Sequence, residues 1–273
     1  MDFFEKIINA LYSTMDTPQH FGWFHLTAIG ITVLLCITFG ILMRKSGEKG
    51  IRIFLIVTSI LLLILELYKQ ILYTYNPSTG KWDYQWYVFP FQFCSVPMYV
   101  ALIAGCCKKC KFRDFLYSFL ATFGMFAGII TMILPDVFTN LIGNNIQTMV
   151  HHGSMIIIGV VLFTSKSVEF KHKTILKALS VFAVFVSIAL LFDCAYIWLG
   201  GTETCNLFFI SPYGQNHFPV FSDIQKISYP LFLGCYIVAF TLAAYIILLI
   251  AMFFNKLASC KKNKSQSSKI KTA

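Results

Sequence analysis

Long runs of apolar residues alternate with short polar segments along the whole chain. Seven of these runs contain about 20 residues, the length that an α-helix needs to cross the hydrocarbon core of a bilayer. They are Phe21–Met43, Ile51–Tyr75, Val88–Gly105, Phe115–Leu134, Gln147–Phe163, Ile175–Leu199 and Tyr229–Phe254. The pattern predicts an all-α, polytopic membrane protein with seven transmembrane helices over residues 1–255. A basic, disordered tail is predicted over residues 256–273.

The basic residues predict how these helices are oriented. All but four of the 22 lysines and arginines lie in or beside the first, third and fifth connections, or in the tail. The exceptions are Lys6, Lys69, Lys81 and Lys226. Loops that are rich in lysine and arginine stay on the cytoplasmic side of a membrane. We therefore expect the amino terminus outside and the carboxyl terminus in the cytoplasm.

The composition agrees with a membrane protein and argues against nucleic acid as a partner. Hydrophobic residues make up 57% of the chain and charged residues 12%, whereas soluble domains contain roughly 45–50% apolar and 25% charged residues. The net charge of +10 does not indicate nucleic acid, because the basic residues lie in short runs between apolar segments. No cofactor is predicted.

The third apolar run differs from the others because it contains polar residues and two prolines. Pro90 suits the first turn of a helix, where its missing N–H costs nothing. Pro97 lies deeper and is expected to bend the helix there and free the carbonyl of Phe93. Cys94 would then lie beside a kink near the outer end of a membrane helix. A thiol at that place is either a small apolar filler or a reactive group.

The predicted topology places the ionisable residues of the membrane segments at a similar depth, in the outer half. Charged groups at membrane depth are costly and usually face a bundle interior or a wet cavity. One outward-facing polar pocket would account for His25, Glu66, Lys69, Cys94, His151, His152 and Asp193. Structural roles are also open. Glu66 and Lys69 can neutralise each other on one helix face, whereas Asp193 can bond to a neighbouring helix and His25 can lie at the interface.

Three further features of the sequence bear on the predicted pocket. His151 and His152 point about 100° apart on a helix, so they cannot both face one partner. No metal site is predicted, because the CxxC motif of Cys107 and Cys110 has no second pair and no nearby histidine. The sixth connection, residues 200–228, is the longest and partly apolar. We expect it to fold back over the outer pocket.

Four segments resemble the YwaF family of bacterial membrane proteins, and the resemblance covers nearly the whole chain. They are Phe21-Gly-Trp-Phe-His25, Pro90-Phe-Gln-Phe-Cys-Ser-Val-Pro-Met-Tyr99, Val150-His-His-Gly-Ser-Met155 and Asn206-Leu-Phe-Phe-Ile-Ser-Pro212. That family is similar to the eukaryotic transmembrane protein 164 acyltransferases, which act on ether phospholipids, and more distantly to androgen-induced hydrolases of lipid esters. The resemblance implies a multi-pass protein of the bacterial plasma membrane whose partners are membrane phospholipids.

The resemblance also implies a catalytic pair. A cysteine and a histidine are the proposed catalytic residues of the acyltransferase, and by position in the motifs these are Cys94 and His152. Other members fill the place of His151 with different residues. Many members have a histidine where this chain has Gln92, so a possible second base is missing here.

A cysteine and a histidine fit the chemistry of acyl transfer. This reaction needs a nucleophile, a base within hydrogen-bond reach and donors for the developing oxyanion. A histidine can take the proton of a thiol near pH 7. Cys94 and His152 are predicted at similar depths on two helices, just below the outer headgroups. Gln92, Tyr99 and Asn206 are the candidate donors to the oxyanion.

Three other functions stay open on the residues alone. A transporter usually has paired broken helices in two repeated halves, whereas only one predicted helix is broken here. A lipid-ester hydrolase would use the same residues with water as the acceptor. A non-enzymatic lipid-binding protein would use none of this chemistry. A retinal protein is disfavoured, because the seventh run, Tyr229–Phe254, contains no lysine.

Overall fold

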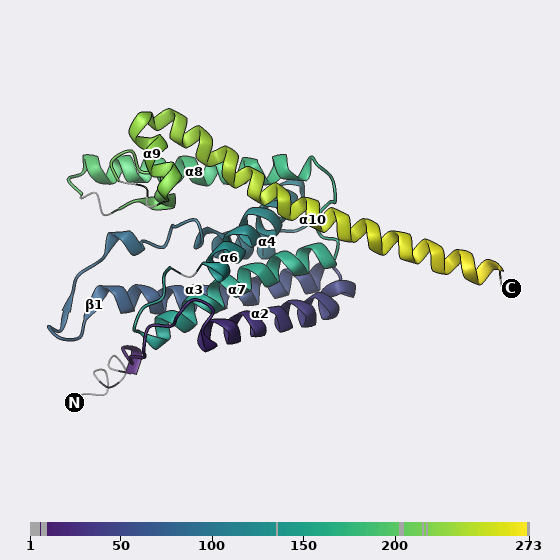
Figure 1. Ribbon diagram of the computed structural model, residues 1–273, viewed down its shortest axis with the longest axis horizontal. Coiled ribbons are helices and arrows are strands. Elements are labelled where there is room, and N and C mark those ends of the chain that lie inside the picture. Colours follow the sequence, from purple (N-terminus) through teal and green to yellow (C-terminus); the bar gives the residue numbers. More distant parts are fainter. Residues whose placement is uncertain are drawn as a thin grey trace.

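The computed structural model describes residues 6, 10–134, 136–201, 205–214, 216 and 218–271, with side chains up to residue 260 apart from residue 219. Figure 1 shows an elongated bundle of helices. Its elements are α2 (Trp23–Leu42), η1 (Met43–Lys45), α3 (Glu48–Thr74), β1 (Tyr75–Asn76), β2 (Lys81–Trp82), η2 (Trp86–Val88), α4 (Val96–Cys106), α5 (Lys111–Phe119), η3 (Leu120–Gly124), α6 (Met125–Ile133), α7 (Ile142–Thr164), α8 (Thr174–Trp198), η4 (Leu207–Phe209), α9 (Pro219–Ile227) and α10 (Tyr229–Lys271).

Six helices among the described residues are long and apolar enough to cross a membrane. They are Trp23–Lys45, Glu48–Thr74, Lys111–Ile133, Ile142–Thr164, Thr174–Trp198 and Tyr229–Cys260. Each coincides with one of the predicted spans, because a chain in lipid must satisfy its backbone polar groups internally and a helix does so within one segment. The last helix, α10, continues to Lys271, through most of the tail for which the sequence predicts disorder.

The third predicted span, Val88–Gly105, differs from the expectation. Val88 ends η2 and only α4, which contains 11 residues, is α-helical there, whereas residues 89–95 form an irregular segment. Pro97 lies in the first turn of α4, where its missing N–H costs nothing. The prediction that Pro97 bends the interior of a helix beginning near Pro90 is therefore wrong. The helix begins later, so the second proline takes the position that was expected for the first.

Helix α7 lies at the centre of the bundle. It packs against α2, α3, α6 and the wide turn η3, and most of its side chains are buried. Helices α2 and α10 bury little of their surface and expose many large apolar side chains. Apolar side chains at the periphery are the surface that a membrane protein presents to lipid tails. The polar residues of α7 are therefore shielded from lipid by the surrounding helices.

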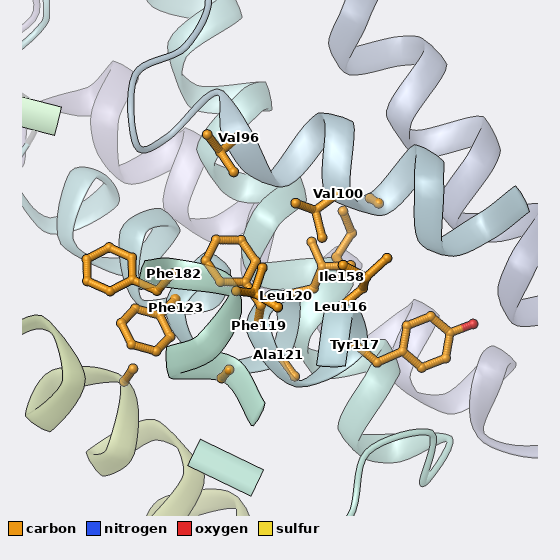
Figure 2. Close-up of a cluster of buried hydrophobic side chains, with 14 of the residues drawn as sticks. Val96, Val100, Leu116, Tyr117, Phe119, Leu120, Ala121, Phe123, Ile158 and Phe182 are labelled. Atoms are coloured by element: carbon orange, nitrogen blue, oxygen red, sulfur yellow. The ribbon is translucent and has the colours of Figure 1, made fainter. Parts of the chain in front are cut away.

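Helices α5 and α6 form one continuous helix that is interrupted by a single π-helical turn, η3. This turn and the residue before it carry fully buried aromatic side chains into the core. Phe119 stacks on Phe123, with ring centroids 5.9 Å apart, and Phe123 stacks on Phe182 of α8 at 4.5 Å. Figure 2 shows these rings next to Val96 and Val100 of α4. The turn thus joins the core to the start of the short helix α4.

The two ends of the bundle carry different loops. At one end, the hydroxyl of Tyr12 donates to the carbonyl of Leu72 at 2.8 Å and to that of Tyr75, and Thr14 forms a β-bridge with Leu141. We call this the hairpin end, because β1 and β2 lie there (Figure 1). The other end holds the connections from α2 to α3, α4 to α5 and α7 to α8, and we call it the basic end.

The predicted orientation leads to a simple accessibility test. A short epitope tag inserted in the exposed turn at residues 77–80, at the hairpin end, should bind antibody added to intact cells. A tag inserted at residues 171–173, at the basic end, should bind antibody only after the cells are permeabilised. The reason is that lysine-rich loops are retained in the cytoplasm. The opposite pattern of accessibility would reverse the orientation of every helix.

Candidate functional site

Residues 89–95 form an irregular segment within a predicted membrane span. Non-helical backbone at membrane depth occurs only where protein buries it or where it lines a cavity. Here the hydroxyl of Tyr99 donates to the carbonyl of Pro90 at 2.9 Å. The N–H groups of Ser95 and Val96 both donate to the carbonyl of Gln92, at 2.8 and 3.2 Å. The segment is therefore a fixed turn, and it carries the half-buried Cys94 thiol.

The imidazole of His151 holds this turn against α7. Its Nε2 lies 3.0 Å from the carbonyl oxygen of Cys94, so Nε2 carries the proton and donates it. In a regular helix that carbonyl would accept from Met98, but the N–H of Met98 donates to Ser95 instead, at 3.2 Å. The late start of α4 thus frees the carbonyl of Cys94 for His151. Sequence reasoning did not predict this contact.

His152 is oriented by its own helix. Its Nδ1 donates to the carbonyl of Thr148 one turn earlier, at 2.8 Å, which leaves Nε2 with the free electron pair. A group that fixes Nδ1–H and so presents Nε2 as a base is the arrangement found in catalytic triads. The two imidazole centroids lie 5.5 Å apart. His152 therefore has the tautomer of a general base, and it follows His151, which bonds to the turn that carries the thiol.

Close contacts between helices fix the position of His152. A Cβ atom on Gly128 of α6 would lie 2.6 Å from the carbonyl oxygen of His152. A Cβ on Gly153 would lie equally close to the hydroxyl of Thr32 on α2. Small residues allow helices to approach closely in membrane proteins. Helix α7 is therefore held between α2 and α6 at the level of the histidines.

An ion pair from α3 completes the cluster. The ammonium of Lys69 lies 2.7 Å from Glu66, and Glu66 also accepts a hydrogen bond from Gln70 at 2.9 Å. Both ionic side chains are largely buried. Lys69 lies within electrostatic range of the Cys94 thiol and of both imidazoles. The structure therefore brings together Cys94, His151, His152, Glu66 and Lys69, from three separate segments of the chain.

Ser95 is a further member that sequence reasoning missed. Its side chain is almost fully buried and lies close to the thiol of Cys94. A hydroxyl in this position can donate to a thiolate or to an oxyanion that forms beside it. The sequence signal for Ser95 was its position directly after Cys94. That position alone does not distinguish it from any other small residue in a helix.

The three candidate oxyanion donors have other partners. The amide oxygen of Gln92 accepts from the backbone of Phe208 at 3.0 Å, and its nitrogen donates to the carbonyl of Asn206 at 3.3 Å. The Asn206 side chain accepts from the N–H of Ser211 at 2.9 Å. Tyr99 donates to Pro90 as described above. The hydrogen bonds of these three side chains hold the irregular segment and the sixth connection in their positions.

The sixth connection folds back into the bundle. Phe208 is fully buried and lies 5.6 Å, ring to ring, from Phe93 in the irregular segment. Its carbonyl accepts from the hydroxyl of Tyr236 on α10 at 2.9 Å. Its φ of 56° is in the left-handed region that non-glycine residues rarely adopt. Contacts from three directions thus hold a strained residue in place.

The two remaining candidates, Asp193 and His25, have structural partners. Asp193 accepts from the N–H of Leu207 at 3.0 Å and from the thiol of Cys205 at 3.7 Å. Burial, followed by the nearby carboxylate, raises the pKa of the Cys205 thiol to about 12, so this cysteine stays protonated at neutral pH. His25 accepts from the N–H of Phe21 at 2.9 Å and donates to a carbonyl of α6 at 2.7 Å. Both nitrogens of His25 are therefore occupied.

No group of three or more histidine, cysteine or carboxylate side chains capable of holding a metal ion occurs among the residues described.

The comparison with known families agrees with the motifs of the sequence. A model described as the TMEM164 family matches residues 17–255, and this match confirms the relationship to transmembrane protein 164. Searches of curated proteins and of solved structures give no match. Because the family match spans nearly all of the helical bundle, this multi-pass membrane protein belongs to the TMEM164 family.

Proposed function

We propose that the protein is a membrane-embedded acyltransferase that moves acyl chains between phospholipids or related lipids through a thioester on Cys94. One observation carries the proposal. The turn that bears the thiol is hydrogen-bonded to one imidazole, and the adjacent imidazole has the tautomer of a general base. A thiol, a base oriented by a third group and a nearby hydroxyl are the parts that covalent acyl transfer requires.

In the first half-reaction, Nε2 of His152 takes the proton of the Cys94 thiol. The thiolate attacks the carbonyl carbon of a lipid ester and forms a carbon–sulfur bond. The Ser95 hydroxyl and the Lys69 ammonium are side chains near the thiol that can stabilise negative charge. As the carbon–oxygen bond of the ester breaks, His152 returns its proton to the departing alcohol. The products are a lysolipid and an acyl thioester on Cys94.

The second half-reaction reverses these roles. A hydroxyl of the acceptor lipid gives its proton to His152 and attacks the thioester carbonyl. A new carbon–oxygen bond forms and the carbon–sulfur bond breaks. The thiolate takes the proton back from His152, so the enzyme returns to its starting state. With water in place of the acceptor hydroxyl, the same steps release a free fatty acid, and the protein would then be a lipid-ester hydrolase.

The position of the thiol suits a lipid substrate. Cys94 lies just before the start of α4, at the end of that helix that faces the hairpin end. The periphery of the bundle is apolar, so acyl chains can lie along it while the ester group meets the polar cluster. Ester carbonyls lie at the boundary between headgroups and hydrocarbon, which is the predicted depth of Cys94.

The experiment that tests the proposal traps the thioester. Membranes that contain the protein are supplied with a phospholipid carrying an alkyne-tagged acyl chain. We expect the tag on the peptide containing Cys94, in a bond that neutral hydroxylamine cleaves. Cys36→Ala is the matched control, because Cys36 is another half-buried membrane cysteine, and this variant should keep the label. Acyl transfer without any label on Cys94 would exclude the covalent mechanism.

A further inference from the structure

A polar cavity lies at the basic end, away from Cys94. Its volume is about 350 Å³, which is within the range of small-molecule sites, roughly 300–1,000 Å³. The start of α3, the start of α5, the α7–α8 connection and α8 enclose it. We propose that this cavity binds a ligand through a phosphate group, and this site is separate from the acyl-transfer site proposed above.

Two buried donors without partners line the floor of the cavity. Arg113 is 4% exposed; its Nη1 bonds to Glu48 at 2.8 Å, but its Nε has no hydrogen-bond partner among the described residues. Tyr117 is 3% exposed, and its hydroxyl is likewise without a partner there. Buried donors are normally satisfied. A ligand with several acceptor oxygens would satisfy both groups.

The orientation of Tyr117 supports this view. Figure 2 shows its ring at the margin of the hydrophobic cluster, with the hydroxyl pointing away from the other labelled side chains. The guanidinium of Arg113 lies 5.2 Å from the centroid of that ring. The guanidinium therefore lies beside the Tyr117 ring, and both residues line the cavity. Arginine presents a fork of donors that matches phosphate geometry.

The charges at the rim favour an anion. Of the three carboxylates that line the cavity, Glu48 is paired with Arg113, and Glu169 lies 3.4 Å from Lys177. Two exposed lysines of the rim, Lys109 and Lys166, make no ion pair within the part of the chain that the structure describes. Only the carboxylate of Asp114 remains to oppose them. The uncommitted charge around the cavity is therefore positive.

Two sources can supply the phosphate. One is the headgroup of a phospholipid in the leaflet at the basic end, and the other is a soluble phosphorylated small molecule. The test uses one probe for each, with the full-length protein purified in detergent. Isothermal titration calorimetry measures binding of glycerol 3-phosphate, against glycerol at matched ionic strength. Native mass spectrometry counts bound phosphatidylglycerol, against phosphatidylcholine.

Tyr117→Phe is the decisive variant, because it removes one hydroxyl and keeps the packed ring. We expect it to weaken binding of the preferred probe about tenfold, the effect of losing one hydrogen bond to a charged group. Lys49→Gln is the matched control, since Lys49 lies at the same end but does not line the cavity; it should bind normally. Cys94→Ala should also bind normally, so failure of the acyl-transfer proposal would leave this result unchanged.

The outcomes decide the proposal and the source together. Saturable binding of glycerol 3-phosphate that is weakened by Tyr117→Phe identifies a soluble ligand. Binding of phosphatidylglycerol alone, with the same loss, identifies a lipid headgroup. Absence of binding for both probes overturns the proposal. Equal loss in Tyr117→Phe and Lys49→Gln also overturns it, because general surface charge would then be the cause. Lys166→Gln, a rim substitution outside the core, repeats the test without any change to buried packing.

Discussion

Replacement of Cys94 by alanine is expected to abolish acyl transfer, to less than roughly 0.1% of the wild-type rate, because no other group of the cluster can form the thioester. Cys94→Ser should be almost as inactive, since a hydroxyl is a far weaker nucleophile when one neutral imidazole assists it. The measurement is lipid mass spectrometry of membranes containing each variant. It scores acyl chains that have moved between phospholipids and fatty acids that have been released.

The structure makes this a clean test. His151 bonds to the backbone carbonyl of Cys94, so truncation of the side chain leaves the tether of the turn intact. Membrane insertion and thermal stability of Cys94→Ala should therefore match those of the wild type and of Cys36→Ala. Wild-type activity in Cys94→Ala would instead exclude a thioester on Cys94 as the intermediate. Fatty-acid release without transfer by the wild type would identify a hydrolase.

Replacement of His152 by alanine is expected to cost about as much as the loss of the thiol. Members of one catalytic unit are not additive, so the double variant with Cys94→Ala should be no worse than either single variant. His151→Ala should lower activity less, by about 10- to 100-fold, because it loosens the turn by about one hydrogen bond to a buried carbonyl. His151→Gln supplies a new N–H donor and should recover part of that loss.

The same lipid assay separates the two histidines. The sequence favours His152 as the base on the resemblance, and its hydrogen bond to Thr148 gives it the appropriate tautomer. An inactive His151→Ala beside an active His152→Ala would keep the covalent mechanism and move the base by one residue. That result would give a catalytic role to Nδ1 of His151, which is buried and has no hydrogen-bond partner in the described part of the chain.

The hydropathy pattern predicted most of the fold because few backbone structures can satisfy their polar groups within lipid. Six predicted spans coincide with long helices, since a membrane segment must satisfy its own backbone groups. The exception is the run that carries Cys94. Both Pro90 and Pro97 are compatible with a first helical turn, and the pattern of apolar residues does not decide between them. Local hydrogen bonds decide, because the carbonyl of Gln92 and the hydroxyl of Tyr99 stabilise the turn that precedes α4.

The sequence predicted which residues form the candidate site better than it predicted the contacts between them. The topology argument placed Glu66, Lys69 and the histidines at one depth; Glu66 and Lys69 lie within electrostatic range of Cys94, and His151 bonds to its backbone carbonyl. Depth, however, does not fix the direction of a side chain. Asp193 and Gln92 shared that depth and proved to hold the sixth connection in place. The hydrogen bond between His151 and the carbonyl of Cys94 could not be predicted from the sequence. It depends on that carbonyl being free, and it is free only because α4 begins late.

The π-helical turn at Leu120–Gly124 has a consequence for sequence alignment and for engineering. A π-turn holds one residue more than the corresponding α-helical turn, so deletion of one residue there would restore a regular helix. The segment beyond the turn would keep its direction, because the wide turn already absorbs the additional residue. The face of α6 with Gly128, which lets α6 touch the carbonyl of His152, would stay in place, whereas a one-residue deletion elsewhere in this helix would rotate that face by roughly 100°. The additional residue thus shows where the register of this helix changes. An alignment of related chains should place any single-residue gap of this helix within those five positions.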